Sequence, residues 1–213
     1  MQPLRAYHLV PPHHGLENLR HRRLKIARLD DLNDPFELWS VAQPDRRLRR
    51  AFRETKDEMA RRYGVVCFSL SWHNPLLWSH YAEKHHGLAL GFDVHSEILK
   101  AVSYVEQRPV LMQINIEVAH WLLYTKYIDW QYEQEARIFT ALEDRDQASG
   151  LYFADYNEQL VLQEVIVGPL SSITKQDLHD ALGTTTNVAF TKGRLAFNSF
   201  QVVADKRGFR AIR

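Results

Sequence analysis

The sequence predicts one α+β domain over residues 1–213, with a mixed or antiparallel core of about eight short strands and flanking helices. Three observations predict this class: apolar runs short enough for strands, longer amphipathic stretches between them, and no repeat, linker or change of composition along the chain. The chain has 213 residues, of which 45% are hydrophobic and 25% charged. These values are ordinary for a globular protein that buries a core of its own.

Charge and cysteine content narrow the class further. The net charge is +1, from 27 basic and 26 acidic residues, a balance that argues against nucleic acid or a membrane surface as the main partner. The single cysteine, Cys67, excludes an internal disulfide, and its apolar neighbours predict a buried thiol. No apolar run is long enough to cross a bilayer and no signal peptide is recognisable, so the sequence predicts a cytoplasmic protein.

The first half of the chain alternates short strands with helices. In order, the expected elements are a strand over 4–10, a short helix over 16–20, a strand over 23–29, a turn over 33–37, a helix over 46–62, a strand over 65–71, a short helix over 76–83 and a strand over 88–92. Asn33, Asp34 and Pro35 suffice for the turn. Phe36 and Glu37 are surplus to it, which predicts that this loop packs against something specific.

The second half repeats the same alternation. The expected elements are a strand over 101–105, an amphipathic helix over 114–125, a strand starting near 132, a loop and edge strand over 150–156, a strand over 160–167, a helix over 174–182 and strands over 187–191 and 197–204. Ser172 or Thr174 is the expected cap of the last helix, and Gly183 follows its end.

A charged motif at the start of the central strand is the first candidate site. If that strand begins near Tyr132, Glu133, Glu135 and Arg137 share one face, because side chains alternate along a strand. Two carboxylates and a guanidinium on one face predict a site for a ligand or for catalysis. The alternative is a solvated edge with an intra-strand ion pair, which contributes little stability.

Several common sites lack their motifs. The chain has no phosphate-binding loop, no G-x-G-x-x-G after a strand and no G-x-S-x-G elbow. The acidic residues at 30–37 are explained by turn formation better than by a nuclease metal site. No metal site is predicted at the four histidines of the middle segment, since neither cysteine nor carboxylate accompanies them at ligand spacing: His73, His80, His85 and His86.

A set of short motifs resembles one bacterial family. The set comprises the segments 33–37, 67–69, 77–82 and 87–92, followed by Lys126, Trp130, Glu133, Glu135 and Arg137. In this order, over nearly the whole chain, they resemble the domain-of-unknown-function family twenty-nine seventy-one. That family has no established activity, so the resemblance implies only a bacterial accessory protein with a role in defence or stress.

A more distant resemblance, to ADP-ribosyltransferases, implies chemistry. Those enzymes use an Arg or His on a first strand, a Ser-x-Ser or Tyr element on a second, and a Glu-x-Glu on a later one. This chain is similar in having Tyr7-His8, Ser69-Leu70-Ser71 and Glu133-Gln134-Glu135 in that order. It departs from the pattern because the serine element lacks the usual central threonine and because Arg5 competes with His8.

The resemblance also implies a role for each residue. Glu135 would stabilise the oxocarbenium-like transition state, His8 would orient the ribose, and Glu133 would face the acceptor. The residues expected to contact NAD are Tyr7, Ser69, Ser71, Tyr81, which would stack on nicotinamide, and Arg137. NAD is then a substrate, with no tightly bound cofactor and no metal, and the acceptor is undefined. The structural alternatives are a core histidine at His8 and strand hydroxyls at the serines.

The competing function is a binding or regulatory module without catalysis. Five aromatic residues could line a pocket or a protein interface, since aromatic side chains dominate such surfaces: Trp72, Trp78, Tyr81, Trp121 and Trp130. A change in melting temperature with NAD discriminates the two functions.

Overall fold

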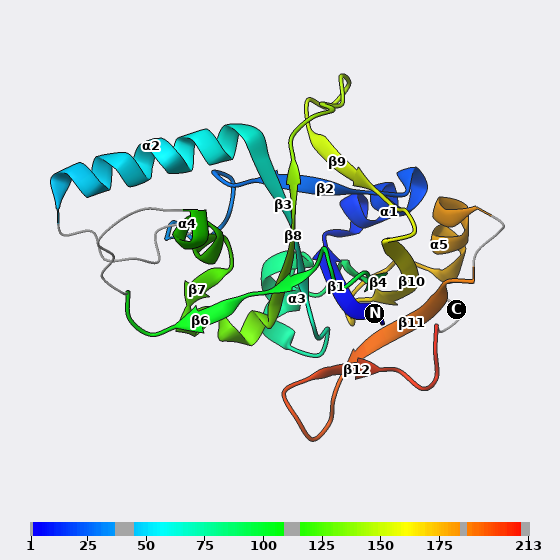
Figure 1. Ribbon diagram of the computed structural model, residues 1–213. Coiled ribbons are helices and arrows are strands. Elements are labelled where there is room, and N and C mark those ends of the chain that lie inside the picture. Colours follow the sequence, from blue (N-terminus) through cyan, green and yellow to red (C-terminus); the bar gives the residue numbers. More distant parts are fainter. Residues whose placement is uncertain (1, 37–44, 109–115, 184–186, 210–213) are drawn as a thin grey trace. The chain divides into compact units, whose positions relative to one another are not determined.

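The computed structural model describes residues 2–36, 45–108, 116–183 and 187–209 (Figure 1). Over these residues the protein is α+β, as the sequence predicts. The helices are α1 (Pro12–His21), α2 (Arg46–Arg62), α3 (Pro75–Tyr81), α4 (Ile116–Leu123), the 3-10 helix η1 (Ile128–Glu133) and α5 (Lys175–Leu182). The strands are β1 (Leu4–Val10), β2 (Arg23–Arg28), β3 (Tyr63–Ser69), β4 (Leu88–Val94), β5 (Lys100–Ala101), β6 (Ser103–Val105), β7 (Thr125–Tyr127), β8 (Glu135–Ala141), β9 (Tyr152–Asp155), β10 (Leu160–Val167), β11 (Ala189–Leu195) and β12 (Val202–Ala204).

The chain divides into two compact units, each built from separate segments. The first unit comprises Met1–Leu24, Phe68–Leu99 and Ala154–Arg213, and the second comprises Lys25–Cys67 and Lys100–Phe153. Strands β2, β3 and β9 each begin in one unit and end in the other. A single domain over 1–213 stays a prediction, and each unit is described by itself below.

The first unit is built on a sheet in the order β12–β11–β10–β4–β1. Strand β4 runs antiparallel to both β1 and β10. Strands β10 and β11 are parallel, and α5 forms the crossover between them. The end of β3 joins β1, where Ser69 is the register partner of Tyr7. These pairings determine which distant residues share a face of the sheet.

The two faces of this sheet are covered differently. On one face lies α1, whose Gly15 is packed against Leu88 and Val10, and α5 lies beside α1 (Figure 1). On the other face, Trp78 of α3 belongs to a buried cluster with Ala89 and Ile166 from the sheet. Tyr7 and Leu9 of β1 pack against that cluster, so α3 covers one end of this second face.

The second unit combines a small sheet with two helices. In it β3 pairs with β2 and β8, β8 pairs with β5, and β6 and β7 form a separate parallel pair. Its core joins Phe52 and Ala60 of α2, Leu122 of α4, and the buried Leu29 and Val65. No helix among the described residues is long and apolar enough to span a membrane.

Some element boundaries differ from the predicted ones for local reasons. Helix α1 starts at Pro12, four residues before the predicted start at Leu16, because proline is well suited to the first position of a helix. The strand predicted over 101–105 is two strands, since β5 pairs with β8 whereas β6 pairs with β7. The predicted terminal strand shrinks to Val202–Ala204. Ile114 and Glu37 lie outside the described residues.

Candidate functional site

The residues predicted to form a site divide between the two units. Glu133, Glu135 and Arg137 belong to the second unit. The others belong to the first: Tyr7, His8, Ser69, Ser71 and Tyr81. Convergence of His8 with Glu135 therefore stays a prediction, and each group has its own geometry.

In the second unit the charged motif forms a buried quartet of Lys126, Glu133, Glu135 and Arg137. Their exposed fractions are 3%, 3%, 5% and 1%. Lys126 Nζ lies 2.6 Å from Glu133 Oε2 and 3.1 Å from Glu135 Oε2. Arg137 donates to both oxygens of Glu135, at 2.7 and 2.9 Å, and to the carbonyl of Leu123 at 2.9 Å. Both oxygens of Glu135 are therefore occupied.

The charges within the buried quartet balance one another. Two cations face two carboxylates, and Lys126 Nζ also lies 4.6 Å from the centre of the Trp130 ring. Burial raises the pKa of Glu135, but Arg137 and then Lys126 outweigh burial and lower that pKa to about 2. Lys126 of β7 joins Glu133 of η1 to Glu135 of β8, so the buried quartet connects these three elements and its geometry favours a structural role.

Glu133 reaches the buried quartet from a helix and not from a strand. The sequence predicts a strand from Tyr132, yet residues Ile128–Glu133 form η1. Gln134 then adopts a left-handed conformation, with φ 44° and ψ 50°, before β8 begins at Glu135. This turn replaces strand alternation as the reason why Glu133 and Glu135 meet. The sequence has no Gly or Asn at this position, which would have predicted a left-handed turn.

In the first unit a second group of charges lies across three neighbouring strands. We call Arg5, Tyr7, Asp93 and Glu164 the sheet-face cluster. Arg5 pairs in register with Asp93, Tyr7 pairs with Gly91, and Gly91 in turn pairs with Glu164. Register partners project from the same face of a sheet, so these side chains meet although they are far apart in sequence.

Hydrogen bonds order the sheet-face cluster. Arg5 Nε donates to Asp93 Oδ1 at 2.7 Å, and Arg5 Nη1 donates to Glu164 Oε1 at 2.7 Å. The Tyr7 hydroxyl donates to the same Glu164 oxygen at 3.1 Å. The side chains of Arg5, Asp93 and Glu164 are 38%, 27% and 20% exposed. Within the described residues, nothing donates to Glu164 Oε2 or Asp93 Oδ2, so the face can accept hydrogen bonds from a ligand.

A β-bulge directs Glu164 onto this face. The register between β10 and β4 shifts between Leu162, which pairs with Phe92, and Glu164, which pairs with Gly91. Without the extra residue Gln163, Glu164 would share the apolar face of Leu162, because side chains two positions apart point the same way. The bulge thus brings Glu164 to the sheet-face cluster, where its side chain is 20% exposed.

Gly91 provides the floor of the sheet-face cluster. A Cβ atom at Gly91 would lie 2.6 Å from Cγ of Glu164 and 3.0 Å from Cε1 of Tyr7. Only glycine therefore lets both side chains cross β4. Burial raises the pKa of Tyr7, and the charge of Glu164 raises it further, so the hydroxyl stays a donor. The hydrogen bond to Asp93 raises the pKa of Arg5.

The other predicted residues of this unit have mixed positions. Ser69 pairs with Tyr7 and shares its face, but its hydroxyl donates to the carbonyl of Ser71 at 2.7 Å. Ser71 lies beyond the end of β3 rather than on the strand. His8 points to the opposite face from Tyr7, 5.9 Å from the ring of Phe68. Tyr81 is the half-buried last residue of α3.

Comparisons with known proteins assign no chemistry to these residues. No family model, curated protein or solved structure matches this chain. Among the residues that the structure describes, no group of histidine, cysteine and carboxylate side chains is arranged to hold a metal ion.

Sequence reasoning missed Asp93 and Glu164. One signal for Glu164 exists, because the apolar pattern of its strand shifts phase by one residue, from Leu160 and Leu162 to Val165 and Val167. Such a shift indicates a bulge. Nothing comparable marks Asp93, whose place depends on the pairing of β4 with β1.

Proposed function

We propose that the protein is an NAD-using enzyme of the ADP-ribosyltransferase type, and that the sheet-face cluster contacts the ribose of NAD. The observation that carries the proposal is the state of Glu164. Its Oε1 is held by Arg5 and Tyr7, while its Oε2 has no donor among the described residues. A preorganised carboxylate with one open oxygen is what a ribose hydroxyl and a developing positive charge require.

The reaction makes modest demands on the protein. The bond between nicotinamide and C1′ of the ribose breaks, and both electrons leave with nicotinamide, which becomes neutral. No proton is needed by the leaving group, so no general acid is required. The ribose becomes an oxocarbenium ion, which a neighbouring carboxylate stabilises. A water or acceptor hydroxyl then bonds to C1′ and releases its proton.

Charge also favours the sheet-face cluster over the buried quartet as the site. With both carboxyl groups ionised, Arg5, Asp93 and Glu164 carry one positive and two negative charges, a net −1 that attracts the cationic nicotinamide end of NAD. The buried quartet is neutral and closed. For Glu135 to act instead, as the resemblance implies, NAD would have to replace Arg137 or Lys126 as its partner. The proposal therefore assigns the carboxylate role to Glu164.

Melting temperatures with increasing NAD test the proposal. We expect NAD to raise the melting temperature of the parent protein, and to raise that of Glu164→Ala far less. Glu158→Ala is the matched control, because it removes an exposed carboxylate that precedes the same strand, and should respond like the parent. If no protein responds, NAD is not the ligand. If all respond equally, NAD binds elsewhere.

A second candidate, the non-catalytic binding module, is favoured by a cavity in the second unit. This cavity of about 200 Å³ is lined by Phe36, Tyr127 and the segment Val105, Glu106, Gln107 and Arg108. Phe36 is 54% exposed, and the Arg108 guanidinium lies 4.4 Å from the centre of its ring. An exposed aromatic–arginine pair suits a planar or anionic partner. Loss of partner binding in Phe36→Ala, without any response to NAD, would support this function.

A further inference from the structure

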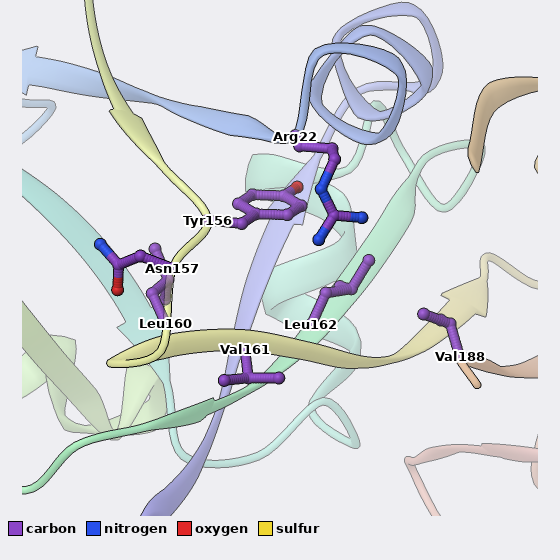
Figure 2. A pocket seen from close by; sticks show the side chains of 7 residues that line it. All are labelled: Arg22, Tyr156, Asn157, Leu160, Val161, Leu162 and Val188. Carbon is purple, nitrogen blue, oxygen red and sulfur yellow. The ribbon is translucent and has the colours of Figure 1, made fainter. Parts of the chain in front are cut away.

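A cavity of about 190 Å³ lies in the first unit, where β10 meets the end of α1. Its apolar lining comes from Leu160, Val161, Leu162 and Val188, and its polar lining from Arg22, Tyr156 and Asn157 (Figure 2). Leu162 pairs with Phe92, and Tyr156 packs on Phe92 with ring centres 5.0 Å apart. The cavity is therefore on the face of the sheet opposite to the sheet-face cluster.

The end of helix α1 places Arg22 at this cavity. Arg22 ends α1 with φ 50° and ψ 47°, a left-handed conformation that is unusual for any residue except glycine, asparagine or aspartate. Its carbonyl accepts a hydrogen bond from the backbone N–H of Tyr156 at 2.8 Å. The left-handed conformation closes the helix, because the backbone N–H of Arg22 donates to the carbonyls of Asn18 and Leu19, as at many helix C-termini.

The guanidinium of Arg22 has no acidic partner within the described parts of the chain. Its central carbon lies 5.8 Å from the centre of the Tyr156 ring, and Figure 2 shows the guanidinium beside that ring and turned toward Leu162. Arg5 and Arg28, by contrast, pair with the carboxylates of Asp93 and Asp30. Arg22 instead keeps its five donors at the edge of an apolar cavity.

Tyr156 adds an unsatisfied donor. Its hydroxyl is buried and has no hydrogen-bond partner among the described residues. Burial raises the pKa of Tyr156, so the hydroxyl keeps its proton. A buried hydroxyl without a partner is unfavourable, and a ligand oxygen held by Arg22 would reach it only after a movement of the Tyr156 side chain, since the hydroxyl is closed off in this structure.

We propose that this cavity binds a small organic carboxylate with a compact apolar body. Arg22 would pair with the carboxylate through two parallel hydrogen bonds, and Leu160, Leu162 and Val188 would enclose the body. The volume is below that of sites for drug-sized ligands, roughly 300–1,000 Å³, so the ligand is small. A phosphate fits less well, because Arg22 is the one cation among the lining residues and balances only part of a phosphate's charge.

The test uses 4-fluorobenzoate as the probe and follows its fluorine NMR signal as protein is added. We expect saturable binding to the parent protein, and binding at least about tenfold weaker in Arg22→Gln, the scale of one lost charge-assisted contact. Lys206→Gln is the matched control, since it removes one exposed positive charge from the same unit. It should bind like the parent.

Two further measurements keep the proposal open to refutation if Arg22→Gln is poorly folded. Val188→Phe, which fills the cavity and leaves Arg22 in place, should also abolish binding. Benzamide, which has the same shape without the charge, should not displace the probe. The proposal is overturned if the parent does not bind 4-fluorobenzoate saturably, if Arg22→Gln and Val188→Phe bind it as the parent does, or if inorganic phosphate displaces it as well as benzoate does.

Discussion

Replacing Glu135 with glutamine removes one negative charge from the buried quartet, which then holds two cations and one carboxylate. The pKa of Glu135 falls from 4.5 to about 2 on folding, a difference of about 2.5, or roughly 3–4 kcal/mol at about 1.4 kcal/mol per pKa unit. Breaking a buried ion pair by removing one partner costs about 3–5 kcal/mol in other proteins. Glu135→Gln should therefore lower the free energy of unfolding by about 3–5 kcal/mol at pH 7.

The pH dependence gives this prediction a second signature. Because the folded-state pKa is depressed, the stabilisation by Glu135 is present above the unfolded pKa of 4.5 and is lost as the pH falls toward about 2. The difference in unfolding free energy between parent and Glu135→Gln should therefore be constant from pH 7 to about 5 and shrink below that.

Urea unfolding followed by tryptophan fluorescence measures both signatures, since Trp130 lies over Lys126. Glu143→Gln is the control, because Glu143 is exposed in the same unit, and it should leave the urea midpoint unchanged. Equal unfolding free energies for parent and Glu135→Gln at pH 7 would refute the structural role of the buried quartet and return Glu135 to the list of catalytic candidates.

Three further predictions concern the first unit. Trp78→Ala should lower the free energy of unfolding by about 3–5 kcal/mol, because a fully buried side chain is lost; thermal or urea unfolding measures this, and an unchanged stability would contradict the packing of α3. Thr174→Ala removes the capping box that Thr174 forms with Asp177 and should cost about 1 kcal/mol by the same measurement, whereas no change would show that the cap is dispensable. Gly91→Ala should displace Glu164 from its hydrogen bonds and reduce NAD turnover, measured at a temperature where the variant is still folded. Full activity would contradict the place of Gly91 in the site.

Local features of the fold could be predicted because burial leaves a periodic trace in the sequence. The bounds of β1, β10 and α2 follow from alternation and from the i, i+3, i+4 spacing. The predicted burial of Trp78 is confirmed, and its indole N–H donates to the carbonyl of Trp72 at 2.7 Å. The predicted cap at Thr174 is confirmed in the same way.

The candidate site could not be predicted because it depends on pairing between distant strands. Arg5 is separated from Asp93 by 88 positions and from Glu164 by 159, and no local pattern encodes which strands become neighbours. The bulge at Gln163 leaves a phase shift that is visible in the sequence but does not say which strand lies opposite. The left-handed turn at Gln134 has no comparable signal in the sequence, so the position of the Glu133 side chain could not be predicted.

The rate of nicotinamide release from NAD, compared between the parent protein and Glu164→Gln, tests the central proposal most directly. The Glu164 side chain is 20% exposed, and glutamine has nearly its shape, so the melting temperature of Glu164→Gln is measured alongside its rate to separate a catalytic effect from a stability effect. We predict that the parent releases nicotinamide and that the rate in Glu164→Gln is lower by a factor of about one hundred or more. This is the scale of losing one preorganised electrostatic partner. Equal rates in the two proteins, or no release by the folded parent, would contradict the assignment of this site.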